Sequence, residues 1–437
     1  MEQAPFLPLP LLWPSQAIAE RLGRDPTTLR LLEAALGPPV GSRPFDSADL
    51  ARAAGRGHID VVRWICDCGM GKSAGAGAGA VLSDADGRRC KANPINAAAQ
   101  GGHIGVAAWL LSAGFALSKS TCQAAAFGGQ LACLVWLREK GCPWDHFTTA
   151  DAALGGNVDC LRWAADNGCP LTDAACQSAA LAGRTAALRF LRERGCPWGT
   201  WTCASAANGG HLDCLEFLRD NGCPWGISTC WTASGTSLPC LAYAHRNGCP
   251  WDQEICSRAA LNGRLDCLAY AMQNGCPSDE RTCAFAAAGG HLDCLAFARE
   301  RGCPWDGKTC SWAATAGHMA CLAFARERGC PWDAETCFGA ASGGRLELLA
   351  FARENGCPWD ERTCAGAALN GHLDVLRWAR DNGCPWDERT SSWASSGGHS
   401  ACLEYALENG CPWEEVAAVA AEEAVAAVAA VAAVAAG

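Results

Sequence analysis

Basic residues are not in excess in this sequence, and it shows no export signal or membrane-spanning run. The 437 residues include 35 Lys and Arg against 45 Asp and Glu, a net charge of -10. This balance argues against a surface that neutralises phosphates, so nucleic acid is not an expected partner. The N-terminus is acidic and interrupted by prolines, unlike a secretory signal. The Ala/Val stretch 424–437 is shorter than the roughly twenty residues of a membrane helix, so no membrane partner is expected either.

Paired cysteine motifs are also missing, although cysteine itself is abundant. None of the 31 cysteines forms a Cys-x-x-Cys pair, and the one close pair is Cys66 and Cys68. Zinc sites are usually built on such pairs, so we expect no metal and no other cofactor. An odd cysteine count without an export signal also argues against a secreted disulfide scaffold. The sequence therefore predicts a reducing compartment, cytoplasmic or nuclear, and cysteines that pack as small apolar residues.

The dominant feature of the sequence is an internal repeat of 27 residues, with one deletion. Each copy ends in Gly-Cys-Pro, with the cysteines at 142, 169, 196, 223, 249, 276, 303, 330, 357, 384 and 411. Two earlier copies, around Leu50–Gly69 and Ile95–Gly114, fit the same template once a Gly/Ala-rich insertion, 71–91, is set aside. Stacked repeats of this kind form one continuous solenoid in which each unit contacts only its neighbours. We count thirteen units.

The pattern inside each unit predicts two helices. The first begins after an N-cap residue such as Asp306 or Asp360, contains small residues and ends at Asn-Gly or Gly-Gly. The second begins at the His-Leu-Asp step and ends at the glycine of Gly-Cys-Pro. Its most regular position is aromatic, six residues after the histidine: Trp64, Trp109, Trp136, Trp163, Phe190, Phe217, Tyr243, Tyr270, Phe297, Phe324, Phe351, Trp378 and Tyr405. We interpret this series as a ladder of core aromatics that contact one another between units.

The segment Ala286-Ala287-Ala288-Gly289-Gly290-His291-Leu292-Asp293 resembles the core of ankyrin repeats, and Gly302-Cys303-Pro304-Trp305 occupies the place of the following ankyrin turn. The resemblance extends over residues 46–413. It departs from ankyrin repeats in length, because these units have 27 residues rather than about 33. Similar short units with a Gly-Cys-Pro-Trp turn occur in ankyrin-like proteins of algae, other protists and large DNA viruses. The resemblance implies an all-α solenoid without the long β-hairpin, and a protein-binding role.

Two other patterns invite a chemical function. Seven of the nine histidines follow a glycine at the start of the second helix, but Gln130, Asn157 or Arg184 replace them in other units. Substitutes of such different chemistry indicate a hydrogen bond in the loop rather than acid–base catalysis. Gly71-Lys72-Ser73 matches the end of a phosphate-binding loop, but it follows a helix and Cys66 stands where the first glycine is required. We therefore expect neither an enzyme nor a small-molecule substrate.

A partner is expected to bind where the units differ from one another. The positions just before the paired alanines of the first helix vary most, and in an ankyrin-like stack they line the exposed face. Aromatic residues and arginine commonly anchor interfaces. The candidate partner-binding residues are Arg258, Phe285, Trp312, Phe338 and Trp393.

Three regions follow: a helical capping segment (1–45), the solenoid (46–413) and a helical Ala/Val/Glu tail (414–437). The favoured function is a non-enzymatic scaffold that binds other proteins on the first helices. An alternative is a ubiquitin-ligase adaptor, because Leu7-Pro8-Leu9-Pro10-Leu11 and the residues after it faintly resemble the start of an F-box. A thiol-rich metal or redox protein is a third hypothesis.

Overall fold

The computed structural model describes residues 47–67, 81–83, 89–91 and 93–413. The expected capping segment, the phosphate-loop-like tripeptide, the Gly/Ala linker and the tail lie outside the described residues. The chain divides into two units, 1–225 and 226–437. Both are built from consecutive helix pairs, and the thirteen pairs confirm the predicted α-solenoid of helix-turn-helix repeats.

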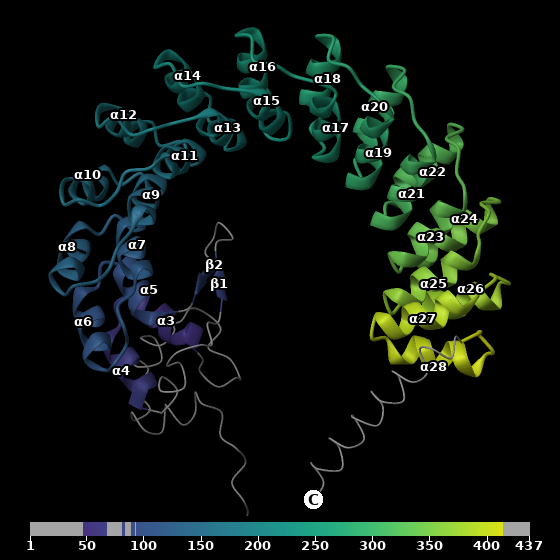
Figure 1. The fold of residues 1–437 in the computed structure, drawn as a ribbon, viewed down its shortest axis with the longest axis horizontal. Helices are drawn as coiled ribbons and strands as arrows, with labels where there is room; N and C mark the ends of the chain where they lie inside the picture. Colours follow the sequence, from purple (N-terminus) through teal and green to yellow (C-terminus); the bar gives the residue numbers. More distant parts are fainter. Residues whose placement is uncertain (1–46, 68–80, 84–88, 92, 414–437) are drawn as a thin grey trace, which may run out of the picture. The chain divides into compact units, whose positions relative to one another are not determined.

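The first unit contains six helix pairs (Figure 1). Its helices are α3 (Ser47–Gly55), α4 (Ile59–Asp67), α5 (Pro94–Gln100), α6 (Ile104–Ser112), α7 (Lys119–Phe127), α8 (Leu131–Glu139), α9 (His146–Gly155), α10 (Val158–Asp166), α11 (Asp173–Leu181), α12 (Thr185–Glu193), α13 (Thr200–Asn208) and α14 (Leu212–Asp220). Within the expected insertion, strands β1 (Val81–Ser83) and β2 (Arg89–Lys91) pair antiparallel, with Leu82 opposite Cys90. The sequence pattern did not predict these two strands.

The second unit contains seven helix pairs. Its helices are α15 (Ile227–Ser234), α16 (Leu238–Arg246), α17 (Glu254–Leu261), α18 (Leu265–Gln273), α19 (Glu280–Gly289), α20 (Leu292–Glu300), α21 (Gly307–Ala316), α22 (Met319–Glu327), α23 (Ala334–Ser342), α24 (Leu346–Glu354), α25 (Glu361–Leu369), α26 (Leu373–Asp381), α27 (Glu388–Ser396) and α28 (Ser400–Glu408). In both units the first helices of successive pairs pack against one another in one layer, and the second helices form the other layer.

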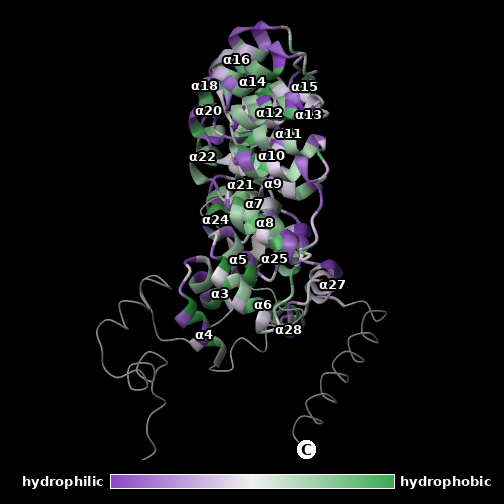
Figure 2. Cartoon of the chain, turned by 90° about the vertical axis from the view of Figure 1, so that its left-hand side faces the viewer, coloured by the Kyte–Doolittle hydropathy of each residue, from purple (hydrophilic) through white to green (hydrophobic). Residues whose placement is uncertain are grey.

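Small residues explain how closely the first helices approach. The buried side of α19, for example, consists of Thr282, Cys283, Ala284, Ala286 and Ala287. The second helices contribute larger side chains, such as Leu295 of α20, to the space between the layers. Hydrophobic and hydrophilic residues alternate along most of the labelled helices in Figure 2, as expected for a two-layer stack exposed to solvent. None of the helices in the described ranges is long and apolar enough to cross a membrane.

Helix ends follow the sequence signals. Asp306 and Asp360 are N-caps whose carboxylates accept hydrogen bonds from the backbone N–H of Lys308 and Arg362, both at 3.1 Å. Every pair except α15–α16, where Gly235 has φ -86°, turns at a glycine with positive φ. At Gly290 (φ 75°) a Cβ atom would lie 2.5 Å from Nδ1 of His318 in the next repeat, so the turn requires glycine for its conformation and for space.

The polar residue after this glycine bonds to the preceding repeat in several cases. Nε2 of His103 lies 3.1 Å from the carbonyl oxygen of Gly55. The Asn157 side chain donates to the carbonyl of Phe127 at 2.7 Å, and Arg184 donates to that of Leu154 at 3.3 Å. At these positions the predicted loop hydrogen bond is confirmed.

The cysteines are buried as predicted, with Cys66 the half-buried exception among those described. They also make hydrogen bonds that the sequence did not suggest. The thiol of every Gly-Cys-Pro cysteine donates to a backbone carbonyl at the start of the first helix of its own repeat. Cys303, for example, donates to the N-cap residue Asp279 at 3.1 Å. Cys283 of the first helix is a free thiol, and a hydrogen bond with the thiol of Cys303, together with burial, raises the pKa of Cys283. The turn cysteine thus fastens the end of each repeat to its beginning.

The aromatic ladder requires a correction. Except for Phe190, which is 4% exposed, its members from Trp109 to Tyr405 are only half-buried. The deepest core positions belong to leucine, cysteine and alanine. Several ladder rings lie beside the tryptophan of the turn that precedes them. The ring centres of Trp378 and Trp359, for example, are 6.2 Å apart. Others lie beside an arginine of a neighbouring repeat. The guanidinium carbon of Arg189, for example, is 5.2 Å from the centre of the Phe217 ring. The ladder is therefore a mixed aromatic–arginine seam at the edge of the core, because its rings have a second partner there.

Candidate partner-binding surface

Three parallel rows of residues run along the first helices of the second unit, and we call these rows the first-helix face. Positions i, i+4 and i+7 of a helix share one side, and in the first helices from α17 to α27 the residues at this spacing are exposed or half-buried, apart from the buried Gly339 and Gly366. The outer row is Glu254, Arg281, Lys308, Glu335, Arg362 and Arg389. The middle row is Arg258, Phe285, Trp312, Gly339, Gly366 and Trp393. The inner row is Leu261, Ala288, Thr315, Ser342, Leu369 and Ser396.

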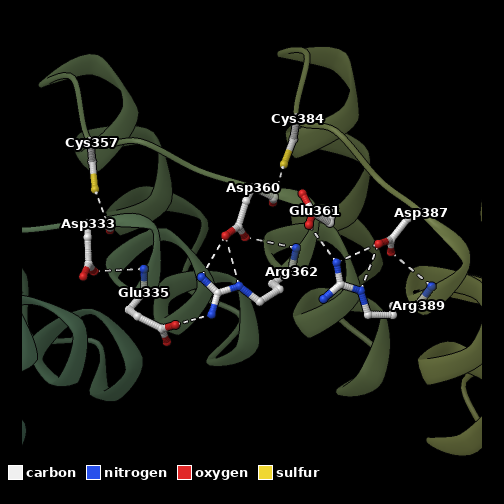
Figure 3. A network of polar contacts seen from close by, with 9 residues as sticks. All are labelled: Asp333, Glu335, Cys357, Asp360, Glu361, Arg362, Cys384, Asp387 and Arg389. Carbon is white, nitrogen blue, oxygen red and sulfur yellow. Dashed lines mark hydrogen bonds and ion pairs between the residues drawn. The ribbon is translucent and has the colours of Figure 1, made fainter.

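The outer row is crossed by ion pairs between neighbouring repeats. Arg362 pairs with Glu335 of the preceding first helix, and Arg389 pairs with Glu361 at 2.7 Å (Figure 3). Both arginines also bond their own N-cap carboxylates, Asp360 and Asp387, at 2.7 Å. These arginines are already neutralised. Because the pairs are solvent-exposed, each contributes little to stability, and their effect is to fix the side chains of the outer row.

The same arrangement occurs at Arg281, which contacts Asp279 at 2.9 Å and Glu254 at 3.6 Å. Two cations of the face differ. In the described part of the chain, Arg258 and Lys308 have no carboxylate partner. Lys308 is exposed and Arg258 is half-buried.

All five residues predicted to bind a partner lie on first helices and are half-buried. The rings of Phe285 and Trp312, on adjacent helices α19 and α21, are 5.2 Å apart. Phe338 belongs to α23 but lies one position before the middle row, and its ring lies against Gly366 of α25. Trp393 is on α27, so α25 separates it from Phe338.

Sequence reasoning missed Trp231 of α15. The guanidinium carbon of Arg258 lies 3.6 Å from the centre of the Trp231 ring. The deletion in this repeat, between Cys230 and Cys240, shifts Trp231 out of the register that we compared. Counting the residues between these two cysteines would have revealed it.

Two exposed aromatic residues of the first unit were also missed. Phe147 of α9 is 51% exposed and Trp201 of α13 is 60% exposed. Both stand two residues into a first helix, the position that carries charge in the second unit. The sequence could have revealed Trp201, because it stands two residues before Cys203, where several other repeats have arginine.

In the described ranges no group of three or more His, Cys, Asp or Glu side chains could hold a metal ion. The first-helix face presents aromatic area, two cations that have no carboxylate partner among the described residues, and Leu261 and Leu369, each 37% exposed.

No protein-family model matches the sequence, and no curated protein matches it. Among solved structures, the human ASB11 ankyrin repeat domain aligns over 42% of this chain and 84% of that chain, with 15% identity and a TM-score of 0.29. The pentatricopeptide repeat protein PPR10, in complex with an 18-nt psaJ RNA element, aligns over 92% of this chain and 66% of that chain, just under two thirds, with 16% identity and a TM-score of 0.35. Both are repeat proteins, as the helix pairs of this chain show it to be. Neither likeness is close enough to assign a narrower family or a partner.

Proposed function

We propose that this chain is a non-enzymatic, ankyrin-like scaffold that binds partner proteins on the first-helix face. One observation carries the proposal. The middle-row position is glycine in two repeats, Gly339 and Gly366. In the other four repeats it is Arg258, Phe285, Trp312 or Trp393. The stack packs with glycine in two of these repeats, where atoms of Thr315 and Phe338 occupy the space beside the backbone, so a large side chain is not required in every repeat. Residues that packing does not require, and that leave aromatic area half-exposed, are the type that anchors an interface.

The test is affinity purification from a cell extract with the whole chain and with a triple variant, Phe285→Ala, Trp312→Ala and Trp393→Ala. We expect proteins that the unchanged chain retains and the variant loses. A matched control changes three exposed residues at the ends of second helices, Arg301, Arg328 and Glu354, to alanine. Circular dichroism and melting temperature establish that all three proteins are folded.

Equal retention of every partner by the chain and the triple variant would contradict this use of the face. The ubiquitin-ligase alternative depends on the F-box-like segment, which lies outside the described residues, and it stays a prediction. Binding of a ligase linker protein that is lost on deletion of residues 1–45 would support it. We further propose that the protein works in a reducing compartment, because its buried thiols act as hydrogen-bond donors.

A further inference from the structure

Arg258 is a cation that the fold holds in place without neutralising it. Its guanidinium stacks on Trp231, and the Nε atom is shielded from solvent without a hydrogen-bond partner in the described structure. Burial lowers the pKa of Arg258. An arginine partly removed from water gains most from a charged hydrogen-bond acceptor, because such a bond replaces the lost hydration. The residue stays half-exposed, so an external group can reach it.

The position of Arg258 is built by its neighbours. A Cβ atom at Gly235, which ends α15, would lie 3.3 Å from Nε of Arg258, so glycine leaves room for the side chain to lie across α15. Trp231 forms the floor of this site. Because two consecutive first helices contribute to it, the orientation of the guanidinium is fixed before any ligand arrives, which lowers the entropic cost of binding.

Aromatic residues occupy the next two positions of the middle row after this cation. Phe285 and Trp312 follow Arg258 in the middle row on the next two first helices, with their rings tilted by 52° at 5.2 Å. Leu261 is exposed on the same helix as Arg258. The sequence of groups along the stack is therefore tryptophan, arginine, phenylalanine, tryptophan.

We propose that the strip Trp231–Arg258–Phe285–Trp312 binds an acidic peptide segment that also carries an aromatic side chain. A glutamate or aspartate carboxylate of the partner pairs with Arg258, and the aromatic side chain packs on Phe285 and Trp312. This inference rests on the proposed function and specifies the chemistry of the partner.

Arginine and aromatic rings also bind single-stranded RNA, but the charges around the strip disfavour it. Glu254 and Glu280 lie on the same two first helices, and Arg281 between them is already paired with carboxylates. A nucleic-acid strand brings a phosphate with every nucleotide and would meet these carboxylates without enough cations. A peptide carries its charges on side chains, so it can present one carboxylate at Arg258 and turn the others toward solvent, whereas every phosphate of RNA belongs to the backbone.

The experiment measures fluorescence anisotropy of four labelled polymers with the full chain: a random Glu–Tyr copolymer, poly-Glu, a random Lys–Tyr copolymer and poly(U) RNA. We expect the Glu–Tyr copolymer to bind most tightly. Arg258→Gln should weaken that binding about ten- to hundredfold, as expected for loss of a charged hydrogen bond. Arg258→Lys, which keeps the charge and loses the planar fork, should restore it in part.

The matched control is Arg301→Gln. Arg301 also lies beside an aromatic ring, 5.0 Å from the centre of Phe297, but at the end of second helix α20. We expect no change in affinity from this variant. Phe285→Ala with Trp312→Ala should weaken binding of the Glu–Tyr copolymer and leave poly-Glu unaffected. Melting temperatures separate loss of contact from loss of fold.

Three results would overturn the inference: no binding of the Glu–Tyr copolymer, equal effects of Arg258→Gln and Arg301→Gln, or tighter binding of poly(U) that depends on Arg258. The last would indicate a nucleic-acid site. If partners from the extract still depend on Phe285 and Trp312 while Arg258→Gln retains them, the proposed function stands and this inference alone fails.

Discussion

At the scale of single residues, cysteine does two tasks that a larger apolar residue could not combine. Cys294 is completely buried on second helix α20, where Val375 takes the equivalent place on α26. Cys303 is buried too, but its thiol donates to a backbone carbonyl 24 residues earlier. Sequence reasoning predicted the first task from the apolar setting. It missed the second because a hydrogen bond between the ends of a repeat depends on the fold.

Buried thiols make stability sensitive to alkaline pH. Burial, with a smaller effect of Asp293, raises the pKa of Cys294 from 9.0 to about 12, and burial raises the pKa of Cys133 and Cys160 to about 11. Above pH 9 the unfolded chain releases these protons and the folded chain keeps them, so stability falls as pH rises. We expect a loss of about 1.4 kcal/mol per pH unit for each such cysteine between about pH 9 and 11. Urea unfolding at pH 8, 9 and 10, followed by circular dichroism, measures it.

A control for this prediction is Cys294→Val, which copies the residue at the equivalent position of α26. At pH 8 the variant should be about as stable as the unchanged chain. At pH 10 it should be more stable by about 1 kcal/mol, because it has one thiol fewer to ionise on unfolding. An identical pH dependence for the two proteins would contradict the assignment to Cys294.

At the scale of helices and turns, the sequence predicted element type and boundaries well. The N-caps Asp306 and Asp360 and the glycine stops repeat once per unit, and the same local signal read many times leaves little ambiguity. What the sequence did not reveal are contacts that join an element to a neighbour. Phe217 was interpreted as a core aromatic, but its edge position and its arginine partner follow from how the helices pack.

The capping residues provide a test in two directions. Replacing Asp306 by alanine removes the acceptor for the Lys308 N–H and should cost about 1 kcal/mol. Gly199 occupies the same place before α13 in an extended conformation (φ -145°), with open space where a Cβ atom would be. Gly199→Asp should therefore stabilise the chain by a few tenths of a kcal/mol. Shifts of both unfolding midpoints in the same direction would contradict this account of the helix ends.

The Gly-Cys-Pro-Trp turn is held by an arginine that the sequence pattern did not single out. Arg299 donates to the carbonyl of Cys303 at 3.1 Å, and its guanidinium carbon is 4.4 Å from the centre of the Trp305 ring. A double-mutant cycle of Arg299→Ala and Trp305→Ala should give a coupling energy of about 0.5–1 kcal/mol. A control cycle that uses Arg301→Ala in place of Arg299→Ala should give a coupling energy near zero, because Arg301 lies beside Phe297 and not beside Trp305.

The chain itself contains repeats without this contact. In one repeat Leu171 replaces the turn tryptophan and Ala165 replaces the arginine. In another, Ser278 replaces the tryptophan and Met272 replaces the arginine. At His245 the contact survives in another form, because its ring stacks on Trp251 at 3.7 Å. The last turn, which has Trp413 with Leu407 at the arginine position, is an exception, but arginine and tryptophan occur together in seven turns. This supports a pairwise interaction rather than two independent preferences.

At the scale of the whole molecule, the two units carry the same fold with different surfaces. The second unit has charge in its outer row, whereas the first unit has Ser120, Phe147, Ala174 and Trp201 at the corresponding positions. The sequence predicted which helices vary and four of the middle-row residues. It did not predict that Arg281, Arg362 and Arg389 are neutralised while Arg258 is not, because pairing depends on which side chains meet across repeats.

Charge distribution also predicts a weak interaction with nucleic acid. The chain carries -10 overall, and the arginines of the outer row are occupied by carboxylates. In a gel-shift assay at about 0.15 M salt, single-stranded RNA should not saturate the chain at concentrations that saturate it with the Glu–Tyr copolymer. Reversing three carboxylates, Glu254→Lys, Glu335→Lys and Glu361→Lys, releases the arginines and adds cations, so this variant should gain RNA binding that falls steeply with salt. RNA binding by the unchanged chain as tight as that of the variant would mean that the outer row does not govern partner choice.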